Sequence, residues 1–265
     1  MGALPFGLFA VLVLLSVPIA FALIIAGALI LVGAEGLPLL IIPQQIVAGM
    51  DSFPMLAVPL FIWAGSIMDV GGISRRLVDL ASSLVGHLPG GLGQVVVLSE
   101  IFFSGVSGST SADAAAIGGI MVPQLAANGY SRARATSIVS AACAMGILIP
   151  PAIVMVIFGV MGNVSIGKLF VACIPPALLL ALGLMLQIGW QARRQNWPKA
   201  ERASSATIWR AATEAILPLF MIVVVLGGIR IGLFTPTEAA AVAVAYALIL
   251  SAGVYRTFTW TQFKR

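Results

Sequence analysis

Unbroken apolar blocks about as long as a membrane-spanning helix recur along this chain of 265 residues, and they constrain its fold more than any other feature. An α-helix crosses the bilayer core with about 20 apolar residues. The blocks fall at residues 4–32, 53–68, 133–160, 164–190, 211–232 and 235–254. Strands of a transmembrane barrel would instead alternate apolar and polar residues. The pattern therefore predicts an all-α integral membrane protein with six crossings.

The composition excludes an ordinary soluble domain. Hydrophobic residues make up 60% of the chain and charged residues only 9%, against about 25% charged residues in a typical soluble domain. With so few charges, we interpret the net charge of +5 as a topology signal and expect no nucleic-acid partner. Cys143 and Cys173 both lie in apolar segments, which favours neither a disulfide framework nor a metal cluster.

The positions of the basic residues predict the orientation in the membrane. With the N-terminus inside, 12 of the 14 Lys and Arg residues fall in cytoplasmic segments, and only Lys168 and Arg230 lie outside. This bias follows the positive-inside rule. The block at residues 53–68 is short and contains Pro54 and Pro59. If it does not cross, the N-terminus lies on the opposite side.

A seventh apolar region, residues 93–126, is interrupted by the polar string Ser-Gly-Val-Ser-Gly-Ser-Thr-Ser at residues 104–111. Non-helical backbone at membrane depth is tolerated only where protein or water surrounds it. We therefore predict a re-entrant hairpin of two half-length helices, open to the cytoplasm. Asp113 follows its tip and would either hold a cation or stabilise the N-terminus of the returning helix.

Three flanking segments have their own predicted roles. Residues 71–92 carry an amphipathic pattern, which predicts an arm helix lying along the membrane surface. Residues 191–210 are rich in polar side chains and predict a cytoplasmic loop. The string Thr-Pro-Thr-Glu at residues 235–238 matches a capping box, so we interpret it as a helix start.

Pro150 and Pro151 lie deep inside the apolar block at residues 133–160. A proline in a helix interior costs about 3 kcal/mol or more, so two in succession predict a broken helix. Broken ends expose carbonyl oxygens, which hold cations in discontinuous membrane helices. The hairpin tip supplies further neutral oxygens and glycines that let backbone approach closely: Gly105, Ser107, Gly108, Ser109, Thr110 and Ser111.

Each of these features also has a structural interpretation. Serine and glycine mediate close helix packing in membranes, and paired prolines also occur as plain kinks. Glu100 is predicted to be a half-buried acid that either pairs with a basic side chain or takes part in transport. Taken together, the hairpin and the broken helix favour an ion or substrate site over packing alone.

The motifs resemble those of the large membrane subunit of tripartite ATP-independent periplasmic (TRAP) transporters. The resemblance covers nearly the whole chain and rests on several separated strings in the right order. They are Asp-Ser-Phe-Pro at residues 51–54, Pro-Leu-Phe at 59–61, the SGxxxAD core at 107–113, Ile-Pro-Pro at 149–151 and Phe-Thr-Pro-Thr-Glu-Ala-Ala at 234–240.

The resemblance implies a sodium-driven secondary transporter in the bacterial inner membrane. Such a transporter takes organic acids, for example dicarboxylates, keto acids or sialic acids, from a periplasmic substrate-binding protein, and a small four-helix membrane subunit completes it. The implied fold is an elevator of two inverted repeats, with scaffold helices at residues 1–70, the transport-type half at 93–190 and an incomplete second repeat at 211–265. A chain with only one hairpin is then expected to be inactive alone.

By the same resemblance, sodium would be bound by six residues: Ser107, Gly108, Ser109, Thr110, Gly146 and Pro150. Ser111, Asp113 and Pro151 are further candidate contacts to the ion or the substrate. No catalytic residue is implied, and no cofactor other than the sodium ion. The sequence departs from the family where hydroxyl residues are usual, because it has Cys143, Ala144 and Ala152 there. Side-chain ligation at those positions is therefore in doubt, whereas backbone carbonyls remain able to serve.

Two other functions compete with transport. The string Gly-Val-Ser-Gly at residues 105–108 fits the motif around the nucleophile of intramembrane rhomboid proteases. A serine nucleophile needs a base, and the only histidine, His87, lies upstream in the predicted surface segment. The second alternative is a truncated, inactive membrane protein with a structural role only.

Overall fold

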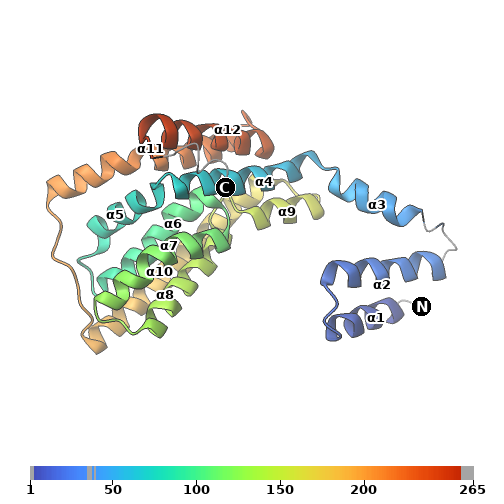
Figure 1. Cartoon of the computed structure of the whole chain (residues 1–265), viewed down its shortest axis with the longest axis horizontal. Helices are drawn as coiled ribbons and strands as arrows, with labels where there is room; N and C mark the ends of the chain where they lie inside the picture. The colour runs from blue at the N-terminus through green and yellow to red at the C-terminus, as the bar shows by residue number, and fades with distance from the viewer. Residues whose placement is uncertain (1–2, 35–37, 39, 258–265) are drawn as a thin grey trace. The chain divides into compact units, whose positions relative to one another are not determined.

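The computed structural model describes residues 3–34, 38 and 40–257, which form helices and contain no strand (Figure 1). This confirms the predicted all-α class. The chain divides into two compact units, residues 1–52 and residues 53–265. The first unit contains α1 (Ala3–Leu14), α2 (Ile19–Ala34) and α3 (Ile41–Met50).

The first apolar block is two helices, so the predicted single crossing at residues 4–32 is wrong. Helix α1 ends at Leu14 and α2 begins at Ile19, and the two pack against each other. Ser16 between them has a positive φ of 61°. Pro18 lacks the N–H that a continuous helix would need, and it disfavours helical backbone at the preceding residue. With 12 and 16 residues, each helix is shorter than a typical membrane span.

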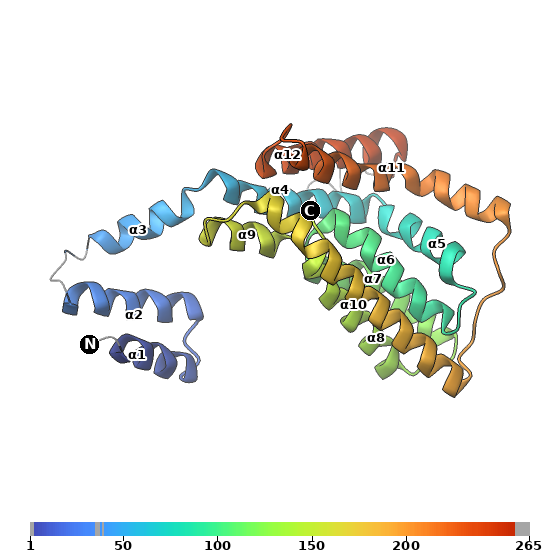
Figure 2. The ribbon, with the colours of Figure 1, turned by 180° about the vertical axis from the view of Figure 1, so that it is seen from behind.

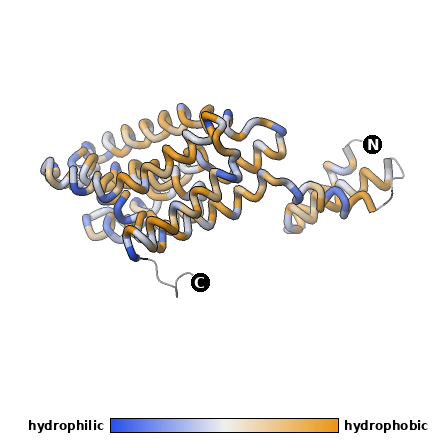
Figure 3. Tube along the Cα trace, turned by 90° about the horizontal axis from the view of Figure 1, so that it is seen from above, coloured by the Kyte–Doolittle hydropathy of each residue, from blue (hydrophilic) through white to orange (hydrophobic). Residues whose placement is uncertain are grey.

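The second unit has five helical stretches long and apolar enough to cross a membrane (Figures 1 and 2). Four of them are formed by the 3₁₀-helix η1 (Phe53–Leu56) with α4 (Ala57–Val70), α10 (Ile166–Gln195), α11 (Ser205–Arg230), and α12 (Pro236–Leu248) with the π-helix η3 (Ile249–Val254). The fifth consists of α8 (Arg132–Met145), the 3₁₀-helix η2 (Gly146–Leu148) and α9 (Ile153–Met161). Hydrophobic residues run along the length of these helices (Figure 3). Together with their number, this identifies a multi-pass membrane protein.

Helix α5 (Ile73–Val85) is the predicted amphipathic helix, but its apolar face is buried against protein. Leu77, Leu80 and Ala81 are at most 5% exposed, and α5 packs on α11 and on α6 (Gly91–Ser107). An amphipathic helix needs an apolar partner for its stripe, and the two helices provide one. The apolar face thus has a protein partner, and the position of this helix along the membrane surface stays a prediction.

The predicted hairpin is present as α6 and α7 (Thr110–Ala127), which pack together on either side of a turn at Gly108. The arms have 17 and 18 residues, or about 26 and 27 Å at 1.5 Å per residue. They are thus longer than the half-length helices that the polar string predicts. Helix α6 continues into that string as far as Ser107, and Ser104, Gly105 and Ser107 are all buried in the protein interior.

The loop after α10 is shorter than predicted, covering residues 196–204 instead of 191–210. Arg193 and Arg194 occupy the last turn of α10, where basic side chains interact favourably with the helix dipole. Asn196 ends the helix in the left-handed conformation. Ser204 then caps α11 by accepting a hydrogen bond from the backbone N–H of Thr207 at 3.2 Å.

The capping box at the start of α12 is confirmed. The Thr235 hydroxyl accepts the backbone N–H of Glu238 at 3.3 Å, and the Glu238 carboxylate accepts the backbone N–H of Thr235 at 2.8 Å. The Thr237 hydroxyl donates to the Phe53 carbonyl at 2.9 Å and ties this end to η1. From there α12 runs beside α4 (Figures 1 and 2). Small side chains allow this close approach, as in many membrane helix pairs: Ala239, Ala240, Ala243 and Ala247 are buried.

Candidate functional site

The hairpin tip and the broken helix lie against each other. The carbonyl oxygen of Gly108 accepts a hydrogen bond from the backbone N–H of Ile153, the first residue of α9, at 3.0 Å. A Cβ atom added at Gly108 would collide with the carbonyl oxygen of Pro151. Gly108 also has a positive φ of 62°, which glycine adopts without strain. The two features that the sequence marks as interrupted therefore meet in space.

The break has the predicted cause. Helix α8 ends at Met145, a 3₁₀ turn covers Gly146 to Leu148, and α9 begins only at Ile153. Pro150 and Pro151 lie in the gap, and the bond between them is cis. Neither proline has an N–H to donate, so the helical ladder stops here. Both are buried.

A set of buried polar side chains links the hairpin arms. The Asp113 carboxylate, in the first turn of α7, accepts hydrogen bonds from the hydroxyls of Ser104 and Ser107 on α6. Ser104 Oγ also lies 3.2 Å from Glu100 Oε1, and the Cys143 thiol donates to Glu100 Oε2 at 3.6 Å. We call these five residues the acid–hydroxyl cluster. All are at most 2% exposed.

Gly146 is the point at which the broken helix touches this cluster. A Cβ atom at Gly146 would lie 2.8 Å from Asp113 Oδ2 and 2.9 Å from Glu100 Oε1, and it would collide with Ser104 Oγ. Such separations are shorter than carbon and oxygen normally show, so a larger residue would fit only if these buried side chains moved. The position therefore brings the backbone of η2 directly against the carboxyl groups of the hairpin.

The remaining tip residues are closer to the surface. The backbone N–H of Ser109 donates to Ser107 Oγ at 3.2 Å, and the hydroxyls of Ser109 and Ser111 lie 3.2 Å apart. Ser109 and Thr110 are half-buried, and Ser111 is exposed. In the described part of the chain, no hydrogen bond joins the side chains of these three residues to the break.

The oxygens gathered here suit a hard cation such as sodium. The carbonyls of Gly108 and Gly146 each accept one backbone hydrogen bond, from Ile153 and from Ile149, and each keeps a second lone pair. Carbonyl, hydroxyl and carboxylate oxygens are the ligands that hard cations prefer. The described residues contain no group of three or more His, Cys, Asp or Glu side chains that could hold a metal ion.

Glu100 differs from its prediction. It is fully buried rather than half-buried, and its contacts are with Ser104 and Cys143 rather than with a basic side chain. Ser104 and Cys143 are absent from the predicted site. One signal was available in the sequence, because Glu100, Ser104 and Ser107 recur at i, i+4 and i+7, which places three polar groups on one face of α6.

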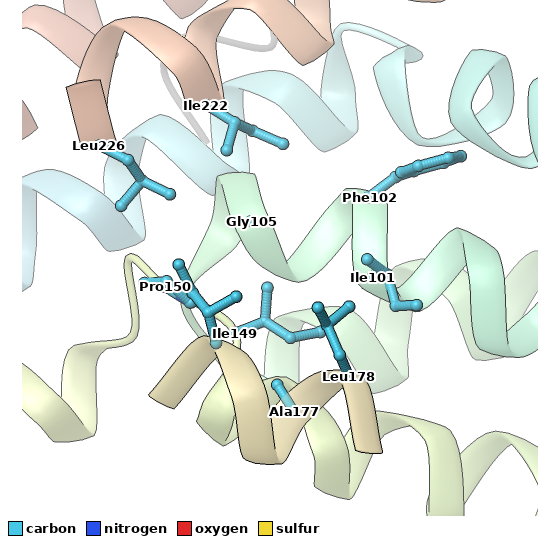
Figure 4. A pocket seen from close by; sticks show the side chains of 10 residues that line it. Ile101, Phe102, Gly105, Ile149, Pro150, Ala177, Leu178, Ile222 and Leu226 are labelled. Atoms are coloured by element: carbon cyan, nitrogen blue, oxygen red, sulfur yellow. The ribbon is translucent and has the colours of Figure 1, made fainter. Parts of the chain in front are cut away.

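A cavity of about 220 Å³ lies on another face of the same helix (Figure 4). Its lining side chains come from α6, the break, α10 and α11, and they include Phe102, Pro150, Ile174 and Ile222. The lining is almost entirely hydrocarbon. The cavity therefore offers an organic anion none of the donors that it would need.

The arrangement does not support serine protease chemistry. His87 precedes the first residue of α6 and Ser107 is its last, so the 17-residue helix, about 26 Å long, separates them. The Ser107 hydroxyl donates to Asp113. A base must lie within hydrogen-bond reach of the serine that it activates.

Comparison with known proteins decides the family. A family model described as "Tripartite ATP-independent periplasmic transporter, DctM component" matches residues 6–265. The chain belongs to this DctM family. This match confirms the resemblance that the sequence motifs indicate. The similar proteins named below are transporter permeases rather than enzymes.

Several DctM relatives are similar over most of this chain. The 2,3-diketo-L-gulonate TRAP transporter large permease protein YiaN of Escherichia coli is 42% identical over 93% of this chain and 58% of its own length. The sialic acid TRAP transporter large permease protein SiaM of Vibrio cholerae is 37% identical, over 94% of this chain and 58% of its own. The isethionate TRAP transporter permease protein DctMQ of Oleidesulfovibrio alaskensis is 41% identical, over 97% of this chain and 41% of its own. The chain thus spans about three fifths or less of the length of these relatives.

Proposed function

We propose that this chain is the part of a TRAP-type large permease that binds the first coupling sodium ion, in a secondary transporter for organic acid anions. One observation carries the proposal: the hairpin tip at Gly108 packs on the proline break, in a membrane helix bundle where exposed carbonyls are otherwise unfavourable. Two interrupted helices that meet are a common way to build an ion site near the membrane midplane.

Sodium would be held between the tip and the break. The proposed ligands are the backbone and hydroxyl oxygens of Ser107, Gly108, Ser109 and Thr110 on one side, with the carbonyls of Gly146 and Pro150 on the other. Ser111, Asp113 and Pro151 are proposed to touch the ion or the substrate. The positive charge of the ion would then lie near the buried Asp113 carboxylate, which lowers the cost of keeping that charge inside the membrane.

The substrate is proposed from the names of the relatives, and the partners are proposed from the family resemblance. These include permeases for 2,3-diketo-L-gulonate, sialic acid and C4-dicarboxylates, all organic acids. We propose a substrate of this class, delivered by a periplasmic binding protein, and a small four-helix membrane subunit as partner. We place the complex in the bacterial inner membrane and propose that it works as an elevator of two inverted repeats.

A chimera tests this function. Residues 6–265 would replace the matching segment of the Escherichia coli relative, and uptake of 2,3-diketo-L-gulonate would be measured in vesicles that contain the other subunits. We expect uptake that depends on a sodium gradient, and none when the 265-residue chain replaces the whole permease. Equal uptake in sodium and choline would contradict sodium coupling. Uptake by the 265 residues alone would contradict the need for a second repeat.

Failure of the chimera to take up substrate, although it inserts and assembles with its partners, would favour the structural alternative. In that case the segment supports the complex without binding an ion. A chimera carrying S99A is a suitable control for a neutral substitution, because the Ser99 hydroxyl is buried and has no hydrogen-bond partner in the described part of the chain.

A further inference from the structure

Glu100 lies at the inner end of the acid–hydroxyl cluster, away from the hairpin tip. It precedes Ser107 by seven positions along α6, or about 10 Å of helix. Contacts nevertheless connect the two residues without a gap. Glu100 contacts Ser104, Ser104 contacts Asp113, Asp113 contacts Ser107, and Ser107 accepts the backbone N–H of Ser109 at the tip.

Both carboxyl oxygens of Glu100 are already occupied by protein. Oε1 lies 3.2 Å from Ser104 Oγ, and Oε2 accepts from the Cys143 thiol at 3.6 Å. The side chain is 0% exposed. Glu100 therefore joins the first hairpin arm to the end of α8, and its place in the cluster is that of a connector rather than of a free ligand.

The connection also reaches the break. Glu100 Oε1 would lie 2.9 Å from a Cβ atom at Gly146, so the carboxyl group packs directly on the glycine that follows α8. The Gly146 carbonyl is one of the proposed sodium ligands. A change at Glu100 therefore disturbs both sides of the proposed site, the tip through Ser104 and Asp113 and the break through Cys143 and Gly146.

We infer that Glu100 is a positioning residue, which sets the register between the hairpin tip and the proline break and thereby the sodium affinity of the site. This inference rests on the sodium site proposed above. A buried acid costs free energy in a membrane unless it is satisfied, and the contacts of Glu100 satisfy it at the place where three helical elements must keep their relative positions.

The test is a sodium titration of the purified 265-residue chain in detergent. The unfolding temperature is measured at each sodium concentration, and choline chloride keeps the ionic strength constant. We expect a sodium-specific rise in the unfolding temperature of the unchanged chain. E100A should shift the midpoint of this titration about tenfold to higher sodium, the size expected when a buried hydrogen-bonding group is lost and its partners stay unpaired. E100Q, which keeps the shape and one acceptor, should restore most of the affinity.

Controls separate positioning from general destabilisation. S99A removes the neighbouring buried hydroxyl, which has no partner in the described part of the chain, and should leave the midpoint unchanged. C143A cuts only the link to α8 and should shift the midpoint in the same direction as E100A, so it also serves if E100A does not fold. A lower unfolding temperature in both salts with an unchanged sodium midpoint, for E100A and C143A alike, would overturn the inference.

The same titration distinguishes failure of the proposed sodium site from failure of the role inferred for Glu100. If the unchanged chain shows the same unfolding temperature in sodium and in choline at every concentration, the site itself is wrong, and the role of Glu100 falls with it. If the unchanged chain responds to sodium and the variants respond equally well, only the role of Glu100 is wrong.

Discussion

Asp113 shows how this chain places an ionisable group at membrane depth. Its carboxylate accepts hydroxyl hydrogen bonds from Ser104 and Ser107, which belong to the opposite arm of the hairpin. This contact fits both interpretations from the sequence, a cation ligand and a residue that stabilises the start of α7. The hydroxyls tie the arms together, and the carboxylate still lies in the first turn of α7, where negative charge is favourable.

D113N should weaken sodium binding more than it weakens the fold. The amide offers one acceptor oxygen where the carboxylate offers two, so one hydroxyl contact is lost or must reverse its direction. We expect a loss of about 1–3 kcal/mol in stability and a clearly higher sodium midpoint in the titration. D69N is a matched control, because Asp69 also accepts a serine hydroxyl, from Ser74 at 2.8 Å, but at the end of α4. An unchanged sodium midpoint in D113N would assign Asp113 to packing and to the helix start.

G108A tests the contact between the tip and the break. The added methyl group would meet the Pro151 carbonyl, and the backbone has a positive φ of 62°. Gly129 has a positive φ of 87° but nothing within 4 Å of an added Cβ. G129A should therefore cost only the backbone strain, about 1–2 kcal/mol, and G108A clearly more. The measurement is the unfolding temperature of the two variants, and equal losses would mean that the tip does not pack on the break.

At the scale of helices, the same tripeptide has two outcomes. Ile-Pro-Pro occurs at residues 149–151, where the helix is broken, and at residues 174–176, where α10 continues from Ile166 to Gln195. The broken copy is preceded by a glycine that fits against the acid–hydroxyl cluster, and it is followed by a backbone hydrogen bond from Ile153 to Gly108. Proline alone therefore predicts where a helix is weak, and tertiary contacts decide whether it opens.

Other elements show the same limit of local patterns. The capping box and the hairpin follow from nearby residues, and the sequence predicts both. The partner of α5 cannot be predicted from nearby residues, because an apolar stripe has the same pattern whether lipid or another helix covers it. Ser16 and Pro18, by contrast, are local signals for the end of α1. The prediction missed them because the apolar block around them is long enough for one continuous spanning helix.

The contact between α5 and α11 predicts a dependence on pH. Partial burial raises the pKa of the Asp79 carboxyl, the positive charge of Arg75 opposes this rise, and Glu214 on α11 adds to it. An acid with a raised folded-state pKa favours the protonated form, so its contribution to stability is largest at low pH and declines as pH rises through that pKa.

D79N should reduce this decline, which is measured as the unfolding temperature of the chain between pH 4 and pH 7. R75A should have the opposite effect. Loss of the arginine charge raises the pKa of the Asp79 carboxyl further, so the decline in stability should extend to higher pH. Identical pH profiles for the unchanged chain and D79N would show that Asp79 does not contribute to this contact.

At the scale of the whole molecule, apolarity and motif order predict the class and the family, and three-dimensional contacts show how the candidate site is arranged. The predicted residues Ser107, Gly108, Gly146 and Pro150 do lie where the tip meets the break. Glu100 and Cys143 were not predicted to touch, because they are 43 positions apart in the sequence and neither carries a motif. A single sequence gives no signal for such a contact between α6 and α8.

The central claim is that sodium binds where the hairpin tip meets the proline break. It is tested most directly by the rate at which a water-soluble thiol reagent modifies S109C, in a C173A background and with Cys143 buried. S137C, on the exposed face of α8, is the reference site. We predict that sodium slows modification of S109C several-fold relative to choline and leaves S137C unaffected. Equal rates for S109C in the two salts would contradict the claim.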